Sequence, residues 1–292
     1  MATVNRRVNV NRIAVHAALI FYTLIATFPI GLVLINSMKS KAAIFADPLA
    51  LPTPSTFDLV GYRQVLEKVN SGLQLGDRMI PDFVVYFGNS LIVTLVSLAL
   101  VLIAGAMAAW ALGEYRFRGN TLVALYMAIG IMVPIRLGTV SILNMIVGMG
   151  LINTLTALVL VYTAMGLPLA ILILGEFMAQ IPRDLREAAR CDGVSEYRIF
   201  TDVILPLIRP AVATVAVFTM VPIWNDLWFP LILASGDGKQ TITLGTQQFI
   251  GQYVTNWNAV LAALSLAIAP ILILYIAFSR HLVRGLTMGA VK

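Results

Sequence analysis

Charged side chains are scarce in this sequence of 292 residues. Asp, Glu, Lys and Arg together make up 12% of it, whereas a soluble globular domain carries about 25% charged residues. This scarcity excludes a water-soluble enzyme of this size, and a 59% share of hydrophobic residues excludes a disordered chain. The mean hydropathy of +0.89 instead indicates a protein whose solvent is a lipid bilayer.

Cysteine is nearly absent as well: Cys191 is the only one, so the chain cannot form an internal disulfide. The two histidines, His16 and His281, stand at opposite ends of the sequence, and no His, Cys and Asp cluster has metal-ligand spacing. A phosphate-binding loop of the form GxxxxGK(S/T) is missing, so the chain itself is expected to bind no ATP. Because no candidate nucleophile has a base in a recognisable arrangement, we predict no catalytic residue, no metal and no cofactor in this chain.

The sequence contains six apolar runs that are long enough to cross a bilayer, which takes about 20 residues each. They cover residues 13–35, 89–112, 121–147, 154–177, 210–233 and 259–278. Gly148-Met149-Gly150 predicts the tight turn that separates the third run from the fourth. The first run is too long for the apolar region of a signal peptide, so we expect it to be a span. The prediction is an all-α membrane protein with six transmembrane helices.

These spans define the expected domain organisation. Residues 1–12 form an N-terminal tail, 13–35 the first span, 36–83 a loop with short helices, 84–280 the core and 281–292 a C-terminal tail. Of the 20 basic residues, which exceed 14 acidic ones to give a net charge of +6, thirteen fall on the side of the two tails. Positive charge is retained in the cytoplasm, so both termini are predicted to lie there, and no nucleic-acid partner is implied.

The most polar stretch of the second half, residues 179–209, would also be cytoplasmic. Pro182 suits the first turn of a helix, and Gly193 suits the left-handed stop after one. Ser195 is expected to cap a second short helix, which would end by Leu205 because Pro206 follows it. These residues predict two short helices joined at a glycine, and such a hairpin could merely connect two spans.

Three residue clusters in this stretch resemble the EAA signature of permease subunits of bacterial ABC importers: Glu187-Ala188-Ala189, Asp192-Gly193 and Ile204-Leu205-Pro206. Other segments are similar to the carbohydrate-importer branch, in particular to the six-span partner of the maltose permease pair. They are Asn89-Ser90, Tyr115-Arg116-Phe117-Arg118-Gly119, Trp224-Asn225-Asp226 and the tail from Arg284. The sequence departs from the family pattern at Arg186 and Cys191, which flank the small residues and are not expected to disturb them.

The resemblance implies a type I importer permease fold in the bacterial inner membrane, with Glu187, Ala188, Ala189, Asp192 and Gly193 coupling it to an ATPase. A second, different permease subunit would complete the pathway for a carbohydrate. Two copies of a cytoplasmic ATPase subunit would bind ATP and Mg, and an extracytoplasmic solute-binding protein would deliver the substrate. Loss of uptake without the ATPase would distinguish this from the alternatives, a secondary transporter that uses Asp226 and a structural subunit without a pathway.

Polar residues inside the spans are the candidates for the pathway, because charge within a membrane usually faces a cavity or a partner. Arg136 and Asp226 would both lie roughly 22–24 Å from the cytoplasmic edge, at 1.5 Å per helical residue, and could pair. Together with Asn144, Trp224 and Asn225 they form the candidate substrate set. Alternatively, Arg136 reaches the outer headgroups, and Trp224 and Trp228 form an aromatic belt.

Overall fold

The structure is a computed structural model that describes residues 10–69, 72–75, 78–250 and 255–288. In these ranges it confirms the all-α prediction, because the strands β1 (Gln74–Leu75) and β2 (Arg78–Met79) form only a small antiparallel ribbon. The chain divides into two compact units. The first contains residues up to Lys68 and Thr246–Leu266, and the second contains Val69–Gly245 and the chain from Ala267 onward.

The first unit contains helices from both ends of the sequence. They are α1 (Val10–Ser37), α2 (Lys41–Ala46), α3 (Val60–Glu67), η3 (Gln247–Phe249) and the beginning of α14 (Trp257–Met288). The Tyr62 hydroxyl lies 2.8 Å from Ser37 Oγ and 2.7 Å from Ser265 Oγ, and thereby links three helices. Two short helices, α2 and α3, lie within the segment 36–83, where the sequence predicts a loop with short helices.

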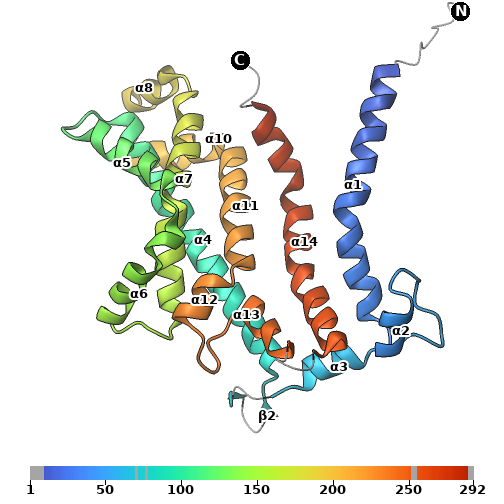
Figure 1. Cartoon of the computed structure of the whole chain (residues 1–292). Coiled ribbons are helices and arrows are strands. Elements are labelled where there is room, and N and C mark those ends of the chain that lie inside the picture. Colours follow the sequence, from blue (N-terminus) through green and yellow to red (C-terminus); the bar gives the residue numbers. More distant parts are fainter. Residues whose placement is uncertain (1–9, 70–71, 76–77, 251–254, 289–292) are drawn as a thin grey trace, which may run out of the picture. The chain divides into compact units, whose positions relative to one another are not determined.

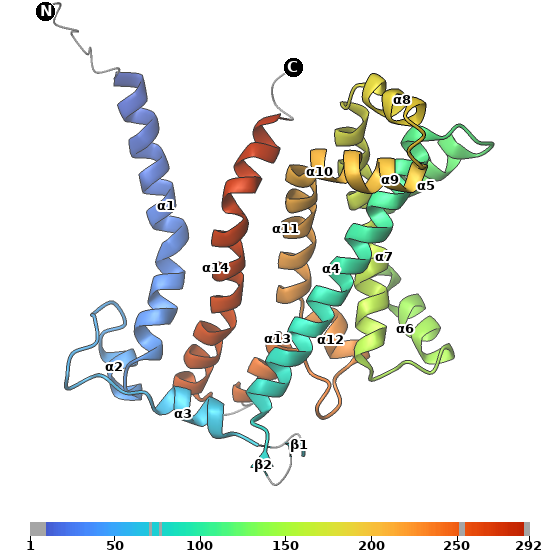
Figure 2. The ribbon, with the colours of Figure 1, turned by 180° about the vertical axis from the view of Figure 1, so that it is seen from behind.

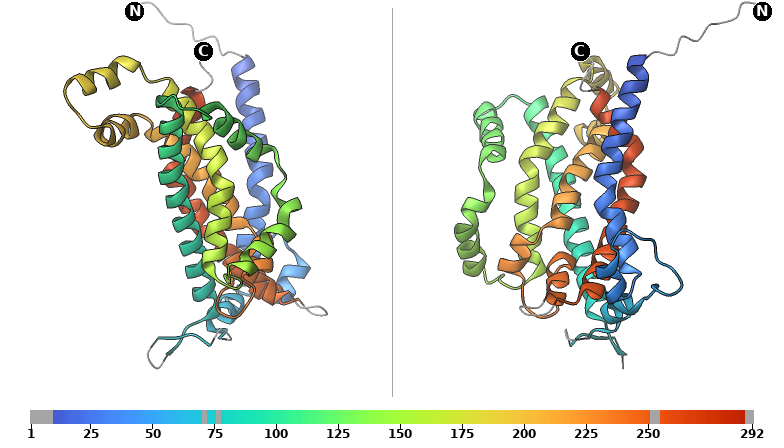
Figure 3. Two further views of the ribbon diagram at one scale, coloured as in Figure 1. Left: turned by 90° about the vertical axis from the view of Figure 1, so that its left-hand side faces the viewer. Right: turned by 45° about the vertical axis from the view of Figure 1, so that its right-hand side comes forward.

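The second unit contains most of residues 84–280, the predicted core, whereas residues 246–266 of that range belong to the first unit. The helices of the second unit are α4 (Asp82–Glu114), α5 (Asn120–Met132), η1 (Ile135–Gly138), α6 (Thr139–Gly148), α7 (Leu155–Ala179), α8 (Arg183–Cys191), α9 (Glu196–Arg198), the π-helix η2 (Ile199–Ile204), α10 (Leu205–Leu207), α11 (Arg209–Asn225), α12 (Trp228–Leu233) and α13 (Ile242–Thr246). The long helices α4 and α7 pack along each other, and α11 packs on both (Figure 1). Helix α8 lies at the opposite end of these helices from α6 and α12 (Figures 1 and 3).

Small residues let α4 and α7 approach closely. A Cβ on Gly105 would lie 2.8 Å from the Cβ of Ala170, and one on Gly166 would lie 2.7 Å from Val101 Cγ2. Buried aliphatic residues fill the space on either side of these contacts, with Leu174 fully buried near α8. Interiors are close-packed, so this seam makes α4 and α7 the rigid centre of the unit.

Two predicted spans are broken in the structure. The prediction of one continuous third span over 121–147 is wrong, since α5 and the η1–α6 segment meet at 92°. Pro134 lies at this break, where proline offers no N–H and disfavours helical backbone at the residue before it. The fifth span does not run unbroken over 210–233 either, because α11 ends at Asn225 and α12 begins at Trp228.

By length and composition, three described helices could cross a membrane, namely α1, α4 and α7; with the two bent pairs the number rises to five. The predicted sixth span lies in α14, whose apolar part among the described side chains is Trp257–Ile273. Helix α4 begins at Asp82, earlier than the predicted Asn89. The turn at 148–150 is confirmed, with Gly150 at a φ of +69°.

Candidate functional site

The EAA-like segment folds as the predicted hairpin, at the end of the second unit where α4 finishes. Helix α8 follows Pro182, and Gly193 takes the left-handed conformation with a φ of +74°. Ser195 precedes α9 with extended backbone, although its hydroxyl makes no capping bond to the described residues. The predicted stop at Leu205 is wrong, because Leu205 and Pro206 fall in the first turn of α10, where a missing N–H is tolerated.

The residues that the sequence assigns to coupling share one exposed end of this hairpin. Glu187, Ala188, Asp192 and Gly193 are exposed, whereas Ala189 is half-buried against the core. The backbone N–H of Val194 donates to the carbonyl of Ala189 at 3.0 Å, which closes the turn. The hairpin therefore presents a narrow surface of small side chains with the carboxylates of Glu187 and Asp192 on it. Helices α9 and α10 run across the helix ends beside it (Figure 2).

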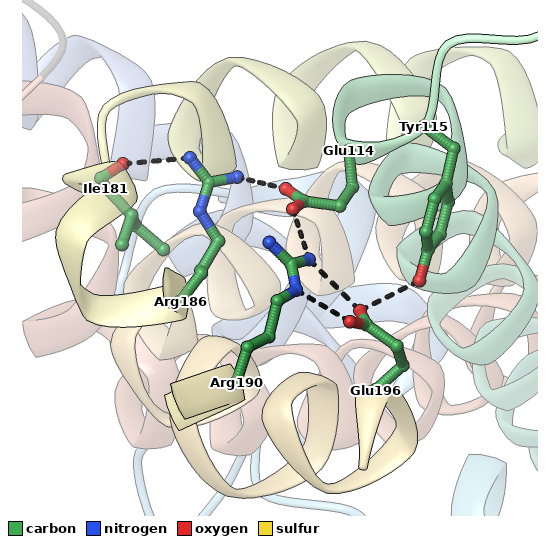
Figure 4. Close-up of polar contacts among 6 residues, drawn as sticks. All are labelled: Glu114, Tyr115, Ile181, Arg186, Arg190 and Glu196. Atoms are coloured by element: carbon green, nitrogen blue, oxygen red, sulfur yellow. Dashed lines mark hydrogen bonds and ion pairs between the residues drawn. The ribbon is translucent and has the colours of Figure 1, made fainter. Parts of the chain in front are cut away.

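A charged network under α8 holds the hairpin to the end of α4 (Figure 4). The Glu114 carboxylate accepts hydrogen bonds from the guanidinium groups of Arg186 and Arg190. Arg190 also donates through Nε to Glu196 at 2.7 Å, and the Tyr115 hydroxyl donates to Glu196 at 2.9 Å. The hydrogen bond between Arg190 and Glu196 favours the charged form of both groups, so it lowers the pKa of Glu196 and raises the pKa of Arg190.

The structure gives Arg186, one of the two departures from the family pattern, a role that the sequence did not predict. Arg186 is 8% exposed and lies beneath the hairpin, with its guanidinium carbon 6.0 Å from the Trp110 ring centre. Sequence reasoning missed Glu114 altogether. The signal in the sequence was an acidic residue at the end of an apolar span, in a chain whose other polar stretch, residues 179–209, is rich in arginine.

The second candidate site lies where α11 gives way to α12. Asp226 Oδ2 accepts from the Tyr162 hydroxyl at 2.7 Å and from the backbone N–H of Phe229 at 3.1 Å. The backbone N–H of Trp228 donates to Asp226 Oδ1 at 3.3 Å. These bonds satisfy the carboxylate without a charged partner and cap the first turn of α12.

Arg136 approaches the same carboxylate from η1. Its Nη2 lies 4.0 Å from Asp226 Oδ1, with 71% of the arginine side chain exposed against 13% of the aspartate. The guanidinium carbon also lies 5.9 Å from the ring centre of Trp228, whose Nε1 donates to Thr139 at 3.0 Å. The structure thus brings Arg136 and Asp226 together at the outer limit of an ion pair. At this distance, and with the arginine largely in solvent, the ion pair contributes little.

A cavity of about 420 Å³ opens beside Asp226. Its walls are mostly apolar, and its polar side chains include Arg136, Tyr162, Asn225 and Asp226. The other two predicted pathway residues lie outside this lining: Asn144 is exposed on α6, and Trp224 is 3% exposed. Trp224 donates through Nε1 to the carbonyl of Ala267 at 3.2 Å, so protein surrounds it and the aromatic-belt alternative is wrong for it.

The sequence from residue 8 to residue 288 matches a family model described as the inner membrane component of binding-protein-dependent transport systems. The chain belongs to this family. A relative, the diacetylchitobiose uptake system permease protein NgcG of Streptomyces coelicolor, is 32% identical over 95% of this chain and 88% of its own. The arabinooligosaccharides transport system permease protein AraQ of Halalkalibacterium halodurans is 29% identical over 93% of both chains.

The fold agrees with this family. A chain in the crystal structure of a bacterial ABC transporter that imports the acidic polysaccharide alginate superposes with a TM-score of 0.78. The superposition covers 97% of this chain and 100% of that one at 20% identity. The resemblance drawn from the EAA-like clusters and the prediction of a type I importer permease fold are confirmed. The permease is a transport protein and not an enzyme.

Proposed function

We propose that this permease forms half of the translocation pathway of an ATP-driven importer for sugars or sugar derivatives in the bacterial inner membrane. Its family membership supports import with a solute-binding protein, and the relatives named above carry saccharides. The observation that carries the proposal is the EAA-like hairpin: Glu187, Ala188 and Gly193 lie exposed at one end of the core, as a docking surface requires. This end of the protein and both termini would face the cytoplasm.

The hairpin would couple the permease to ATP hydrolysis in separate subunits. Ala188 and Ala189 keep the surface narrow enough to enter a groove of an ATPase subunit, and Glu187 offers a carboxylate to basic or N–H groups there. The left-handed backbone at Gly193 fixes the angle at which the surface is presented. Two ATPase copies, each holding ATP and Mg, a second permease subunit and an extracytoplasmic binding protein would complete the complex.

The cavity beside Asp226 would form part of the sugar pathway. Asn225 and Asp226 supply amide and carboxylate groups for hydroxyls, Arg136 supplies donors, and the apolar walls suit the C–H faces of a sugar ring. Trp224 is instead a buried packing residue whose N–H is already engaged. Both carboxylate oxygens of Asp226 already accept hydrogen bonds within this chain, so a sugar would approach the exposed guanidinium of Arg136 first.

The test is uptake of labelled oligosaccharides into proteoliposomes that contain the full complex. We expect uptake only when the ATPase subunits, ATP and the binding protein are all present. Uptake that an ion gradient drives without the ATPase would support the secondary-transporter alternative that uses Asp226. Absence of uptake in every combination of subunits and saccharides would support a structural subunit.

A further inference from the structure

We propose that Glu114, at the last residue of α4, is the positioning residue that fixes the EAA-like hairpin to α4, so that movement of the hairpin reaches this helix directly. The inference rests on the proposed coupling function and adds a residue outside the EAA-like segment to it. The Glu114 side chain contacts no candidate substrate site; it acts through Arg186 and Arg190.

The geometry makes Glu114 the centre of the attachment. One of its carboxylate oxygens accepts from Nη1 of Arg186 and the other from Nη2 of Arg190. These arginines are four residues apart on α8, so they lie on the same face of that helix. A single carboxylate therefore contacts α8 at two points one helical turn apart, which resists rotation of α8 about either contact (Figure 4).

Burial makes the attachment between Glu114 and Arg186 hard to break. Each of these side chains is only 10% exposed, and the arginine lies over Trp110. Removing one partner would leave the other as an uncompensated, largely buried charge. The pair at Arg190, whose side chain is 36% exposed, is a weaker second contact.

The network also fixes the shape of the hairpin. Arg190 contacts Glu196 across the turn at Gly193, through Nε at 2.7 Å and Nη2 at 3.1 Å. Glu196 in turn accepts from Tyr115, the residue that follows Glu114. Both arms of the hairpin are therefore tied to the end of α4. Trp110 on α4 adds an apolar contact to Phe200, with ring centres 6.1 Å apart.

This attachment gives the hairpin a second mechanical connection to the membrane-spanning helices. Peptide bonds join α8 to α7 through residues 180–182. Without the network, α4 would follow the hairpin only through apolar packing, on α7 and between Trp110 and Phe200. With the network, a displacement of α8 moves the ends of both α4 and α7. These two helices move as one layer because they are closely packed against each other. The cavity beside Asp226, lined partly by α7, lies on that layer.

The experiment compares Glu114→Gln and Arg186→Met in the full transport complex. The measured quantity is the number of sugar molecules taken up per ATP hydrolysed. We expect it to fall at least about fivefold in both variants, the lower range of coupling between sites, with ATPase subunits still bound. Glu114→Asp, which keeps a carboxylate for both arginines, should retain at least half of the wild-type ratio. The control is Glu176→Gln, an exposed carboxylate on α7, which should leave the ratio unchanged.

A spectroscopic measurement separates positioning from a general loss of folding. Cys191, exposed at the last residue of α8, is the only cysteine of the chain and takes a nitroxide label without further substitution. In complexes whose other subunits lack cysteine, and whose labelled wild type still transports, Glu114→Gln should make the label more mobile. Glu114→Asp should keep the wild-type spectrum. If Glu114→Gln does not assemble, the comparison of Glu114→Asp with Arg186→Met decides.

The result that overturns the inference is an unchanged transport ratio and label spectrum in both single variants, or a loss in Glu114→Asp as large as in Glu114→Gln. Ala188→Trp, at an exposed position where the added volume should block docking, distinguishes this failure from failure of the proposed function. If Ala188→Trp abolishes transport while Glu114→Gln does not alter it, the hairpin couples without the attachment to α4. If Ala188→Trp transports normally, the coupling role of the hairpin itself is wrong.

Discussion

Replacement of Gly193 tests the coupling hairpin through its backbone alone. A Cβ at this position would meet nothing within 4 Å, so a side chain here adds no clash. The φ of +74° is left-handed, and this conformation costs a residue with a Cβ about 1–2 kcal/mol. Such a cost lowers the population of the intact turn by a factor of about 5–30. The hydrogen bonds between Arg190 and Glu196 across the turn oppose this loss.

The expected order of effect follows from that cause. Gly193→Asn should be mildest because asparagine tolerates left-handed backbone, Gly193→Ala should be intermediate, and Gly193→Val should be most severe. The assay is ATP hydrolysis stimulated by the loaded binding protein, together with sugar uptake, at equal amounts of membrane-inserted complex. Gly113→Ala is the matched control, because Gly113 also has open space around its Cβ position but no positive φ. Equal loss in the valine and asparagine variants, or full transport by the valine variant, would refute the reasoning.

Four further predictions concern the other sites and the orientation. Tyr162→Phe removes a hydrogen bond to a charged group, which contributes about 1.5–3 kcal/mol, and should therefore lower the rate of sugar uptake. Arg136→Gln should weaken sugar affinity, and a double-mutant cycle of uptake rates should show little coupling between it and Asp226→Asn. In a Cys191→Ser background, a cysteine at Ser195 should resist an impermeant reagent added outside and one at the exposed Asp237 should react; labelling of Ser195 from outside would reverse the orientation. The hydrogen bond from Arg190 lowers the pKa of Glu196 below its ordinary 4.5. Hydrogen-exchange protection of the hairpin should therefore be full above pH 4.5 and decline as the pH falls below it. An equal decline in Glu196→Gln would argue against this cause.

The sequence alone predicted the features that depend on composition and on short-range backbone chemistry. Few charges and long apolar runs indicated a membrane protein, because a bilayer tolerates little else. Gly193 and the turn at 148–150 were predicted correctly, since left-handed backbone favours glycine wherever the chain places it. The EAA-like clusters indicated the family because they are contiguous in the chain. The breaks at Pro134 and Asp226 were missed, although both residues were visible in the sequence.

Only the tertiary structure decided which polar residues meet. Glu114 and Arg186 are 72 positions apart, and Tyr162 and Asp226 are 64 apart. No periodicity of one helix records such a pairing, because it depends on the register at which two helices pack. The same packing buries Trp224, which the sequence placed in the pathway, and leaves Arg136 exposed at 4.0 Å from Asp226. Residue type therefore specified the solvent and the turns, while helix packing determined which charges are held inside the protein and which remain available to a ligand.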